Sequence, residues 1–290
     1  MKKLISGKVR EIYEISDQEL VIVTTDRISA FDVILNSTIK DKGIVLNLIS
    51  LYWFDYTRDI IPNHIISDRL SDMPAYFSEN PAQFDRRTVL VKKLRMLPWE
   101  FVVRGYMFGS MWKEYQASQS FCGQRLREGY RLAEKLAEPV VTPSAKNSAG
   151  HDEYVPLERL RRELGAAEAD RICAVSLQLY RACFAQALKK GIIVADTKFE
   201  FGYDENGALV LGDEIFTPDS SRFWAADDYR AGISPKSYDK QFVRDWLTER
   251  GLNGVTPAPA LPQKVADATA GLYRECCRRI TGRELITTNV

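Results

Sequence analysis

Residues 193–202 read IVADTKFEFG, and residues 211–214 read LGDE. Alternation through the first stretch predicts a strand with charged side chains on one face and apolar side chains on the other. The charged face holds Asp196, Lys198 and Glu200, and the apolar face holds Ala195, Phe199 and Phe201. The Asn206-Gly207 pair is a strong hairpin signal, so we expect a return strand through residues 209–211.

The register of this hairpin determines which carboxylates meet. With a two-residue turn, Tyr203 pairs with Val210, and Glu200 then lies directly across from Asp213. Facing carboxylates repel each other unless a cation lies between them, and hard oxygen ligands suit Mg²⁺. The sequence therefore predicts a site for metal and phosphate on this face, with a solvated strand face as the alternative.

Composition restricts the class of protein. The chain has 290 residues, 45% of them hydrophobic and 27% charged, as in ordinary globular proteins. Its formal net charge of +1 indicates neither nucleic acid nor an anionic membrane as a partner. No window approaches the ~20 apolar residues of a membrane span, and no signal-peptide pattern is present. Five cysteines without a Cys-x-x-Cys pair favour a reducing, cytoplasmic location.

The pattern of secondary structure changes along the chain. Residues 1–95 read mostly as strands, interrupted by an apolar helix at 47–60. Later segments mix helices and strands, with the clearest helix at 170–190 and a final amphipathic helix at 265–280. We therefore expect an α+β fold of two lobes, a β-rich lobe at residues 1–95 and a larger α+β lobe at residues 96–290.

A short basic segment, Gly7-Lys8-Val9-Arg10, lies at the start of a predicted strand hairpin. Lys8 and Arg10 would share one face, and Gly7 would let the backbone approach a ligand closely, which suits nucleotide phosphates. An exposed edge strand explains the same residues. The GxxxxGK[ST] and GxGxxG motifs are absent, so P-loop and Rossmann folds lose their main support.

Charged residues also occur inside the apolar strand predicted near residue 101. Glu100 and Arg104 each need a partner or a ligand there, because burying an isolated charge is costly. Gly109-Ser110 then begins a helix, and a helix N-terminus is a natural anion site. The alternative is an internal ion pair between Glu100 and Arg104, with Ser110 as the helix cap.

Polar segments later in the chain provide further candidates. Residues 142–153 are small and polar and predict a long loop, where functional residues concentrate. His151, one of only two histidines, reads as a solvated loop residue rather than a general base. In residues 217–224, Arg222 beside serines suits a phosphate and Asp219 suits a hydroxyl or amine, although an ordinary turn explains the segment too.

Taken together, these segments resemble the phosphoribosylaminoimidazole-succinocarboxamide synthase (SAICAR synthetase) family. The matching segments run in the family's order and cover most of the chain: GKVR (7–10), DRISAFD (26–32), Glu100 with Arg104 and Gly109-Ser110, TPS (142–144) with Lys146, GHDE (150–153), DTKFEFG (196–202), Asp213-Glu214 and TPDSSR (217–222). The resemblance implies a SAICAR synthase-like fold with ATP in the cleft between the lobes.

The resemblance also implies an ATP-dependent amide ligation. ATP would phosphorylate the carboxylate of carboxyaminoimidazole ribotide (CAIR), and the amino group of L-aspartate would displace the phosphate to give SAICAR. ATP and Mg²⁺ are the implied cofactors, and a monomer or small homo-oligomer would bind CAIR and L-aspartate. The alternatives are a divergent paralogue that joins another carboxylate and amine, a small-molecule kinase, and a non-catalytic nucleotide-binding module.

The family match also assigns roles to individual residues. Mg²⁺ would be held by Glu200 and Asp213. ATP would be bound by Gly7, Lys8, Arg10, Lys92, Lys93, Leu94 and Glu200. The residues implied in catalysis are Lys198, Asp196 and Glu100. Substrate contacts would come from Arg104, Ser110, Lys146, Asp152, Asp219, Ser221 and Arg222.

Several positions depart from the family pattern while the ATP and metal residues match it. Phe108 and Met111 stand beside the implied phosphate contacts, where smaller residues are usual. Other departures are Trp99, Ala145, Asn147 and Tyr154. The departures therefore affect the prediction of the exact substrates more than the prediction of ligase chemistry.

Overall fold

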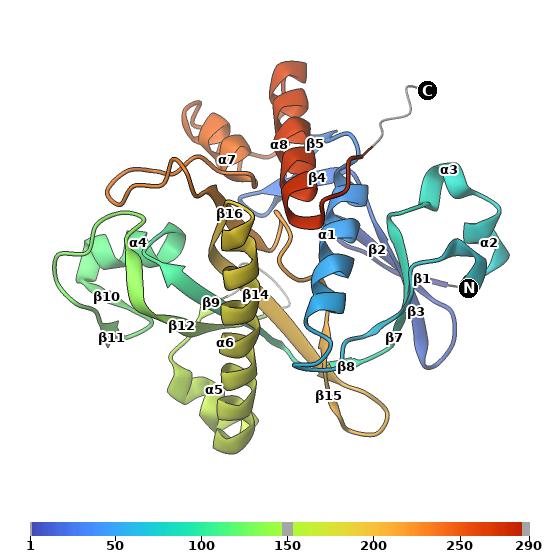
Figure 1. The fold of residues 1–290 in the computed structure, drawn as a ribbon, viewed down its shortest axis with the longest axis horizontal. Coiled ribbons are helices and arrows are strands. Elements are labelled where there is room, and N and C mark those ends of the chain that lie inside the picture. Colours follow the sequence, from blue (N-terminus) through green and yellow to red (C-terminus); the bar gives the residue numbers. More distant parts are fainter. Residues whose placement is uncertain (1, 147–152, 286–290) are drawn as a thin grey trace.

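An N-terminal antiparallel sheet and a longer central sheet form the framework of the protein (Figure 1). The computed structural model describes residues 2–146 and 153–285, so the predicted site residue Asp152 and its neighbour His151 lie outside the described part of the chain. Helices pack against both sheets. This mixture of helices and antiparallel sheets is an α+β fold, as predicted.

The N-terminal sheet consists of short strands whose pairings are all antiparallel. In spatial order its strands are β1 (Lys2–Ser6), β2 (Arg10–Glu14), β3 (Glu19–Thr24), β7 (Thr88–Lys92) and β6 (Ile65–Ser67). One side of the sheet is covered by short segments between β6 and β7: a 3₁₀ turn (Leu70–Asp72), α2 (Ala75–Ser78) and α3 (Pro81–Phe84). A separate hairpin consists of β4 (Arg27–Ala30) and β5 (Val33–Thr38).

The central sheet is organised around one long strand, β14 (Ile192–Tyr203), which contains the IVADTKFEFG stretch. In spatial order the sheet contains β13 (Glu153–Tyr154), β12 (Lys135–Ala145), β9 (Trp99–Tyr106), β14 and β15 (Leu209–Gly212). Two further strands pair with β14, namely β16 (Ser221–Ala225) and β8 (Arg95–Met96). A small hairpin lies apart from the sheet, formed by β10 (Ser120–Phe121) and β11 (Gln124–Arg125).

Helix α6 (Ala166–Lys189) crosses the front of β14 in Figure 1. Its apolar stripe, which includes Ile172 and Leu179, shares one core with Phe199 and Phe201 of β14. The remaining helices are α1 (Lys42–Tyr56), α4 (Gly109–Ser118), α5 (Leu157–Leu164), α7 (Gln241–Thr248) and α8 (Gln263–Thr281). No helix within the described ranges is long and apolar enough to cross a membrane.

Helix α1 begins at Lys42, earlier than the predicted start at residue 47. Its first turn lies directly against the N-terminal sheet, because a Cβ on Gly43 would come within 2.2 Å of the Thr24 carbonyl oxygen. Further along, Trp53 packs in the central core beside α6 and α8, as the course of α1 in Figure 1 suggests. One helix therefore contacts both the N-terminal sheet and the central core.

Two segments predicted as loop or turn are partly strands. Residues 142–145 belong to β12 and pair with β9, and residues 221–224 belong to β16 and pair with β14. The Pro and Ser residues in these segments obscured the strand signal, and the extended conformation depends on pairing with strands that are distant in sequence.

The predicted apolar face of β14 needs one correction. Phe199 and Phe201 share the central core, but Ala195 packs in another cluster with Tyr106 and Trp224. The pairing of β14 with β16 shifts register between Val194 and Asp196, and such an irregularity changes the side-chain alternation locally.

Candidate active site

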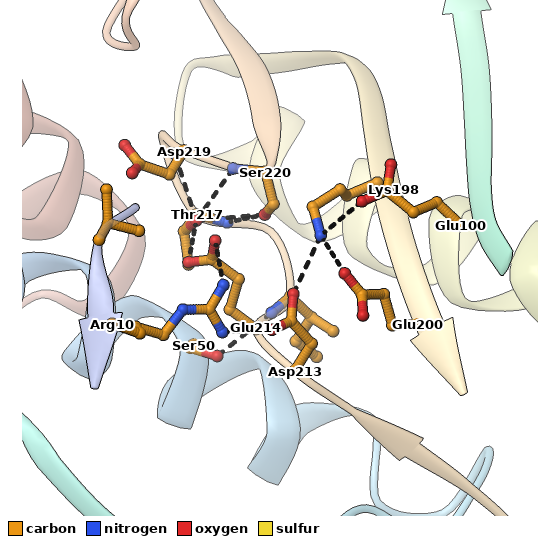
Figure 2. Close-up of polar contacts among 12 residues, drawn as sticks. Arg10, Ser50, Glu100, Lys198, Glu200, Asp213, Glu214, Thr217, Asp219 and Ser220 are labelled. Carbon is orange, nitrogen blue, oxygen red and sulfur yellow. Dashed lines mark hydrogen bonds and ion pairs between the residues drawn. The ribbon is translucent and has the colours of Figure 1, made fainter. Parts of the chain in front are cut away.

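The side chain of Lys198 forms the centre of a charged cluster (Figure 2). Its Nζ lies 2.5 Å from Glu200 Oε1, 3.0 Å from Asp213 Oδ2 and 3.3 Å from Glu100 Oε1. Strand β14 supplies Lys198 and Glu200, β9 supplies Glu100, and Asp213 follows the end of β15. The predicted charged face of β14 therefore does gather carboxylates around a cation.

The predicted register of the hairpin is wrong by one residue. Glu200 pairs with Gly212 rather than with Asp213, and Tyr203 pairs with Leu209. The connection is longer than two residues, because the Asp204 N–H donates to the Ala208 carbonyl at 3.1 Å. Asp213 still reaches Lys198, with a left-handed backbone φ of 58° just beyond the strand.

Arg10 connects the N-terminal sheet to this cluster. Its guanidinium donates to Asp213 and, at 3.0 Å, to Glu214 Oε1 (Figure 2). Burial opposes ionisation of Asp213, but Arg10 and Lys198 outweigh this effect and hold its pKa well below the ordinary value. Asp213 is therefore a carboxylate at neutral pH.

Glu200 has a less favourable environment. Burial and the neighbouring Asp213 raise its pKa, although Lys198 and Lys146 act in the opposite direction. Lys146 contacts Glu200 directly through its ammonium group. A divalent cation beside Glu200 and Asp213 would relieve the repulsion that raises this pKa.

The donor set at this position fits Mg²⁺. Within residues 2–146 and 153–285, no group of three or more His, Cys, Asp or Glu side chains is arranged as a metal cage. Mg²⁺ is commonly held by one or two carboxylates, with water and phosphate oxygens as its other ligands. Glu200 and Asp213 are a donor set of that kind.

A cavity of about 190 Å³ opens beside the Lys198 cluster. Glu100 and Lys198 line one part of it, and Arg104, Asp196 and Arg222 line another. The remaining lining residues are Val102, Tyr154, Thr197, Pro218, Asp219, Ser220, Ser221 and Arg244. Most of the predicted catalytic and substrate residues therefore surround one cavity.

Arg104 is almost completely buried at 1% exposure. Its Nε donates to Thr142 Oγ1 at 3.0 Å, and its Nη2 donates to Ser110 Oγ at 3.1 Å. The acid nearest to it is Asp196, at 3.6 Å, whereas Glu100 pairs with Lys198. The alternative of an internal Glu100–Arg104 ion pair is therefore wrong.

Ser110 lies in the first turn of α4, as predicted, but it is not the helix cap. Phe108 occupies the cap position and makes no capping bond through its side chain. The Ser110 hydroxyl is instead the acceptor for Arg104. The helix N-terminus and a buried guanidinium therefore meet at one point, which favours binding of an anion.

Arg222 completes this group from strand β16. Its Nη1 donates to Asp196 Oδ2 at 2.5 Å, and its Nε is buried with no hydrogen-bond partner in the described part of the chain. A Cβ on Gly109 would lie 2.6 Å from Nη2 of Arg222, so a glycine is needed where α4 begins. The exposed part of the Arg222 side chain lines the cavity, where its guanidinium can bind an oxyanion.

Other predicted residues lie elsewhere or have other partners. Lys8 pairs with Asp32 at the surface. Lys93 Nζ lies 2.5 Å from Glu14, and the Lys92 N–H donates to the His64 carbonyl at 2.8 Å. The remaining contacts involve Gly7 with the Arg10 carbonyl, Leu94 beside Gly202, and the Ser221 hydroxyl donating to Thr197 at 2.8 Å.

Some residues that line the cavity or contact its lining were not predicted as site residues from the sequence. The Tyr154 ring centroid lies 4.8 Å from Arg104 Cζ, and the Phe121 ring centroid lies 5.0 Å from it. Arg244 reaches the cavity from α7, and Lys42 and Lys240 contact Asp219. Their sequence neighbourhoods carry no signal of a site, because these contacts arise only from the tertiary fold.

Comparison with known proteins agrees with this geometry. The SAICAR synthetase family model matches residues 3–259. Two similar proteins are named phosphoribosylaminoimidazole-succinocarboxamide synthase. The one from Methylobacillus flagellatus is 50% identical, and the match covers 98% of this chain and 95% of the relative. The one from Chromobacterium violaceum is 48% identical, and the match covers 97% of this chain and 99% of the relative. A solved Saccharomyces cerevisiae SAICAR synthase in complex with SAICAR is 40% identical, with a TM-score of 0.90 over 98% of this chain and 96% of that chain.

The fold and these relatives define an enzyme of the ligase class that acts in purine biosynthesis. The chain belongs to the SAICAR synthetase family. The predicted family and the predicted fold class are therefore confirmed.

Proposed function

We propose that this chain joins the carboxylate of CAIR to the amino group of L-aspartate, using ATP and Mg²⁺, and releases SAICAR, ADP and phosphate. One observation carries the proposal. A single cavity has Lys198 and Glu100 at one end, and the buried Arg104 and the half-buried Arg222 at the other, in the order of these residues along the paired strands. The first end suits phosphoryl transfer, and the second suits a phosphorylated substrate.

The phosphoryl-transfer end explains how ATP would be used. Enzymes accelerate phosphoryl transfer mainly by positioning and by electrostatic stabilisation. Arg10 and Lys198 place positive charge where phosphate oxygens would lie, and Lys198 would contact both the transferred phosphoryl group and the acceptor carboxylate. Glu200 and Asp213 would hold Mg²⁺, which would neutralise charge on the nucleotide phosphates. A solved SAICAR synthetase that is 27% identical to this chain is in complex with ADP.

The arginine end explains how the ribotide would be oriented. Arg104, Ser110 and Arg222 would bind its 5′-phosphate, and Asp196 keeps both guanidinium groups in place. Once the imidazole carboxylate carries the phosphoryl group, the amino group of L-aspartate would attack its carbonyl carbon. The carbon–nitrogen bond forms as phosphate leaves, so no covalent bond to the enzyme is required.

The proposal includes a division into lobes at residues 1–95 and 96–290, with ATP at their junction. The contact of Arg10 from β2 with Asp213 beyond β15 supports a nucleotide site there. The roles of Lys8, Lys92, Lys93 and Leu94 toward ATP, and of Lys146 and Asp219 toward substrate, remain part of the proposal. The oligomeric state and the cytoplasmic location stay predictions.

The test is release of ADP by the purified protein with ATP, Mg²⁺, CAIR and L-aspartate, and with each omitted in turn. We expect ADP release that requires all four components and is matched by SAICAR formation. ADP release without L-aspartate, with phosphate retained on the product, would indicate a kinase. Binding of ATP without SAICAR formation would indicate a paralogue with other substrates.

A further inference from the structure

Lys42 is a buried lysine that the proposed mechanism does not use. Its side chain is 0% exposed, and its Nζ donates to Asp219 Oδ2 at 2.7 Å from the first turn of α1. Lys240 Nζ lies 3.0 Å from the same oxygen atom, and the Tyr273 hydroxyl donates to Asp219 Oδ1 at 2.8 Å. One buried carboxylate therefore holds two lysines and a neutral phenol.

This arrangement contains more positive charge than the ion pair needs. Lys240 alone would neutralise Asp219, and removing charges from water is costly even when they are paired. Burial and the proximity of Lys42 lower the pKa of Lys240, which reflects the same excess of positive charge. A buried charge that destabilises the folded protein is commonly kept for function.

The excess charge adjoins the cavity, because Asp219, which both lysines contact, is one of the lining residues. The cavity lining there includes Asp196, Asp219, Arg104, Arg222 and Arg244, and the charges that act on these residues include Asp239, Lys42 and Lys240. Cations outnumber acids there by two charges, and a phosphate monoester carries about −1.5 to −2 charges at pH 7. With an anion of that charge bound, this end of the cavity would be nearly neutral.

Lys42 also holds the turn at Asp219, and this turn is hydrogen-bonded to Lys198. Asp219 belongs to the turn before β16, and the Ser220 carbonyl in that turn accepts the Lys198 N–H at 3.1 Å. Farther along α1, the Ser50 hydroxyl accepts the Ile215 N–H at 3.2 Å. Helix α1 thus holds the segment between Asp213 and Arg222 at two points.

We propose that Lys42 is a positioning residue that favours binding of the phosphorylated substrate, through an unbalanced buried charge and through its hold on Asp219. This inference rests on the proposed function, in which a phosphorylated ribotide occupies the arginine end. It predicts that Lys42 weakens the fold slightly and strengthens substrate binding. An ordinary structural ion pair would instead strengthen the fold and leave substrate binding unchanged.

The test compares Lys42→Met with the wild-type enzyme in binding, kinetics and urea unfolding. We expect the KM for CAIR and the Kd for ribose 5-phosphate to rise roughly tenfold or more, because one nearby charge is lost. The Kd for MgADP should stay unchanged and the urea midpoint should not fall. A second variant, Lys42→Met with Lys240→Met, should lose stability sharply, since Asp219 would then be buried without a cation.

The matched control is Lys190→Met. Lys190 donates to the Ile280 carbonyl near the end of α8, away from the cavity. This control should lower the urea midpoint and leave the KM for CAIR unchanged. The inference is overturned if Lys42→Met behaves like the control.

The readouts separate this inference from the proposed function. Absence of SAICAR formation by the wild-type enzyme would contradict the proposed function. Binding of ribose 5-phosphate needs no turnover, so the comparison of Lys42→Met with wild type still decides the inference. An unchanged Kd for ribose 5-phosphate in Lys42→Met would overturn it.

Discussion

Arg222 lies opposite Asp196 in the antiparallel ladder of β16 and β14, and its Nη1 lies 2.5 Å from Asp196 Oδ2. The same carboxylate oxygen lies 3.6 Å from Nη1 of Arg104 on the neighbouring strand β9. One buried acid thus joins two arginines that border the same cavity. Because Arg222 gives Nη1 to Asp196 and its side chain is still 21% exposed at the cavity, a bound oxyanion can add contacts without displacing Asp196.

Replacement of Arg222 should weaken binding of the ribotide more than it slows the reaction. A hydrogen bond from a charged group contributes about 1.5–3 kcal/mol. Arg222→Ala should therefore raise the KM for CAIR by roughly 10- to 150-fold, with a smaller change in kcat. Initial rates at varied CAIR concentration measure both parameters.

The control for this experiment is Arg131→Ala. Arg131 pairs with Glu134, and its side chain is mostly exposed and does not line the cavity. Its loss should leave the KM for CAIR unchanged. An unchanged KM in Arg222→Ala as well would show that Arg222 does not bind the ribotide.

Removal of one carboxylate from the Lys198 cluster should stop turnover. Asp213→Asn keeps the shape of the side chain and removes the charge that faces Arg10 and Lys198. We expect kcat to fall by roughly 10³-fold or more, the order that charges around a transferred phosphoryl group contribute. Assays at saturating Mg²⁺ measure the loss, and wild-type rates there would contradict the assignment of Asp213 as a metal ligand.

Asp204→Asn is a matched control in the same hairpin. Asp204 Oδ1 accepts the N–H groups of Asn206 and Ala208 at 3.0 and 2.9 Å. An asparagine oxygen can accept the same bonds, so this variant should retain both the fold and the activity.

The hairpin also shows how far the sequence predicts this site. Alternation is a local property, so the strand and its charged face of Asp196, Lys198 and Glu200 were predictable. The register was not, because Asp204 accepts N–H groups within the connection and extends it beyond the two residues that the Asn-Gly signal suggests. The observed register differs from the predicted one by one residue, so Gly212 lies opposite Glu200. Asp213 lies just beyond the strand and contacts Lys198 from there.

Residues far apart in the chain were the hardest to predict. Lys42 meets Asp219 across 177 residues, and Arg244 reaches the cavity from a helix after the last recognised motif. No local pattern of charge or hydrophobicity encodes such contacts. The resemblance to a family identified the motif residues but not the side chains that support them.

Two of the departures from the family pattern, Phe108 and Tyr154, lie beside arginines of the cavity. The Phe108 ring centroid lies 5.6 Å from Arg222 Cζ, and the Tyr154 ring centroid lies 4.8 Å from Arg104 Cζ. Met111 is buried in a neighbouring cluster with Phe121, and Trp99 lies in the central core. Ala145 joins that core at the end of β12, and Asn147 lies outside the described residues. Phe108 and Tyr154 therefore pack against the arginines that we expect to bind phosphate.

The aromatic ring of Tyr154 should make a small contribution to ribotide binding. A cation–π contact at a partly exposed site contributes about 0.5–1 kcal/mol. Tyr154→Leu should therefore raise the KM for CAIR about two- to fivefold, whereas Tyr154→Phe, which keeps the ring, should match the wild type. Equal losses in both variants would assign the effect to the hydroxyl group, and no loss in either would remove Tyr154 from the site.

Acid sensitivity should come in part from Glu11 on β2, which pairs with Lys3 and Arg27. Burial opposes its ionisation, but contacts from Lys3, Tyr13 and Arg27 outweigh this effect and lower its pKa from 4.5 to about 2. A carboxyl group with a lowered pKa in the folded state stabilises the protein above its unfolded pKa, and this contribution disappears as the pH falls from 4.5 toward 2.

Glu11→Gln should therefore reduce the free energy of unfolding at pH 7 by roughly 1 kcal/mol, since partly exposed ion pairs contribute little. Urea unfolding of both proteins at pH 7, 5, 4 and 3 should show the difference shrinking only below about pH 4.5. A difference that stays constant over this range would mean that Glu11 does not titrate with the lowered pKa.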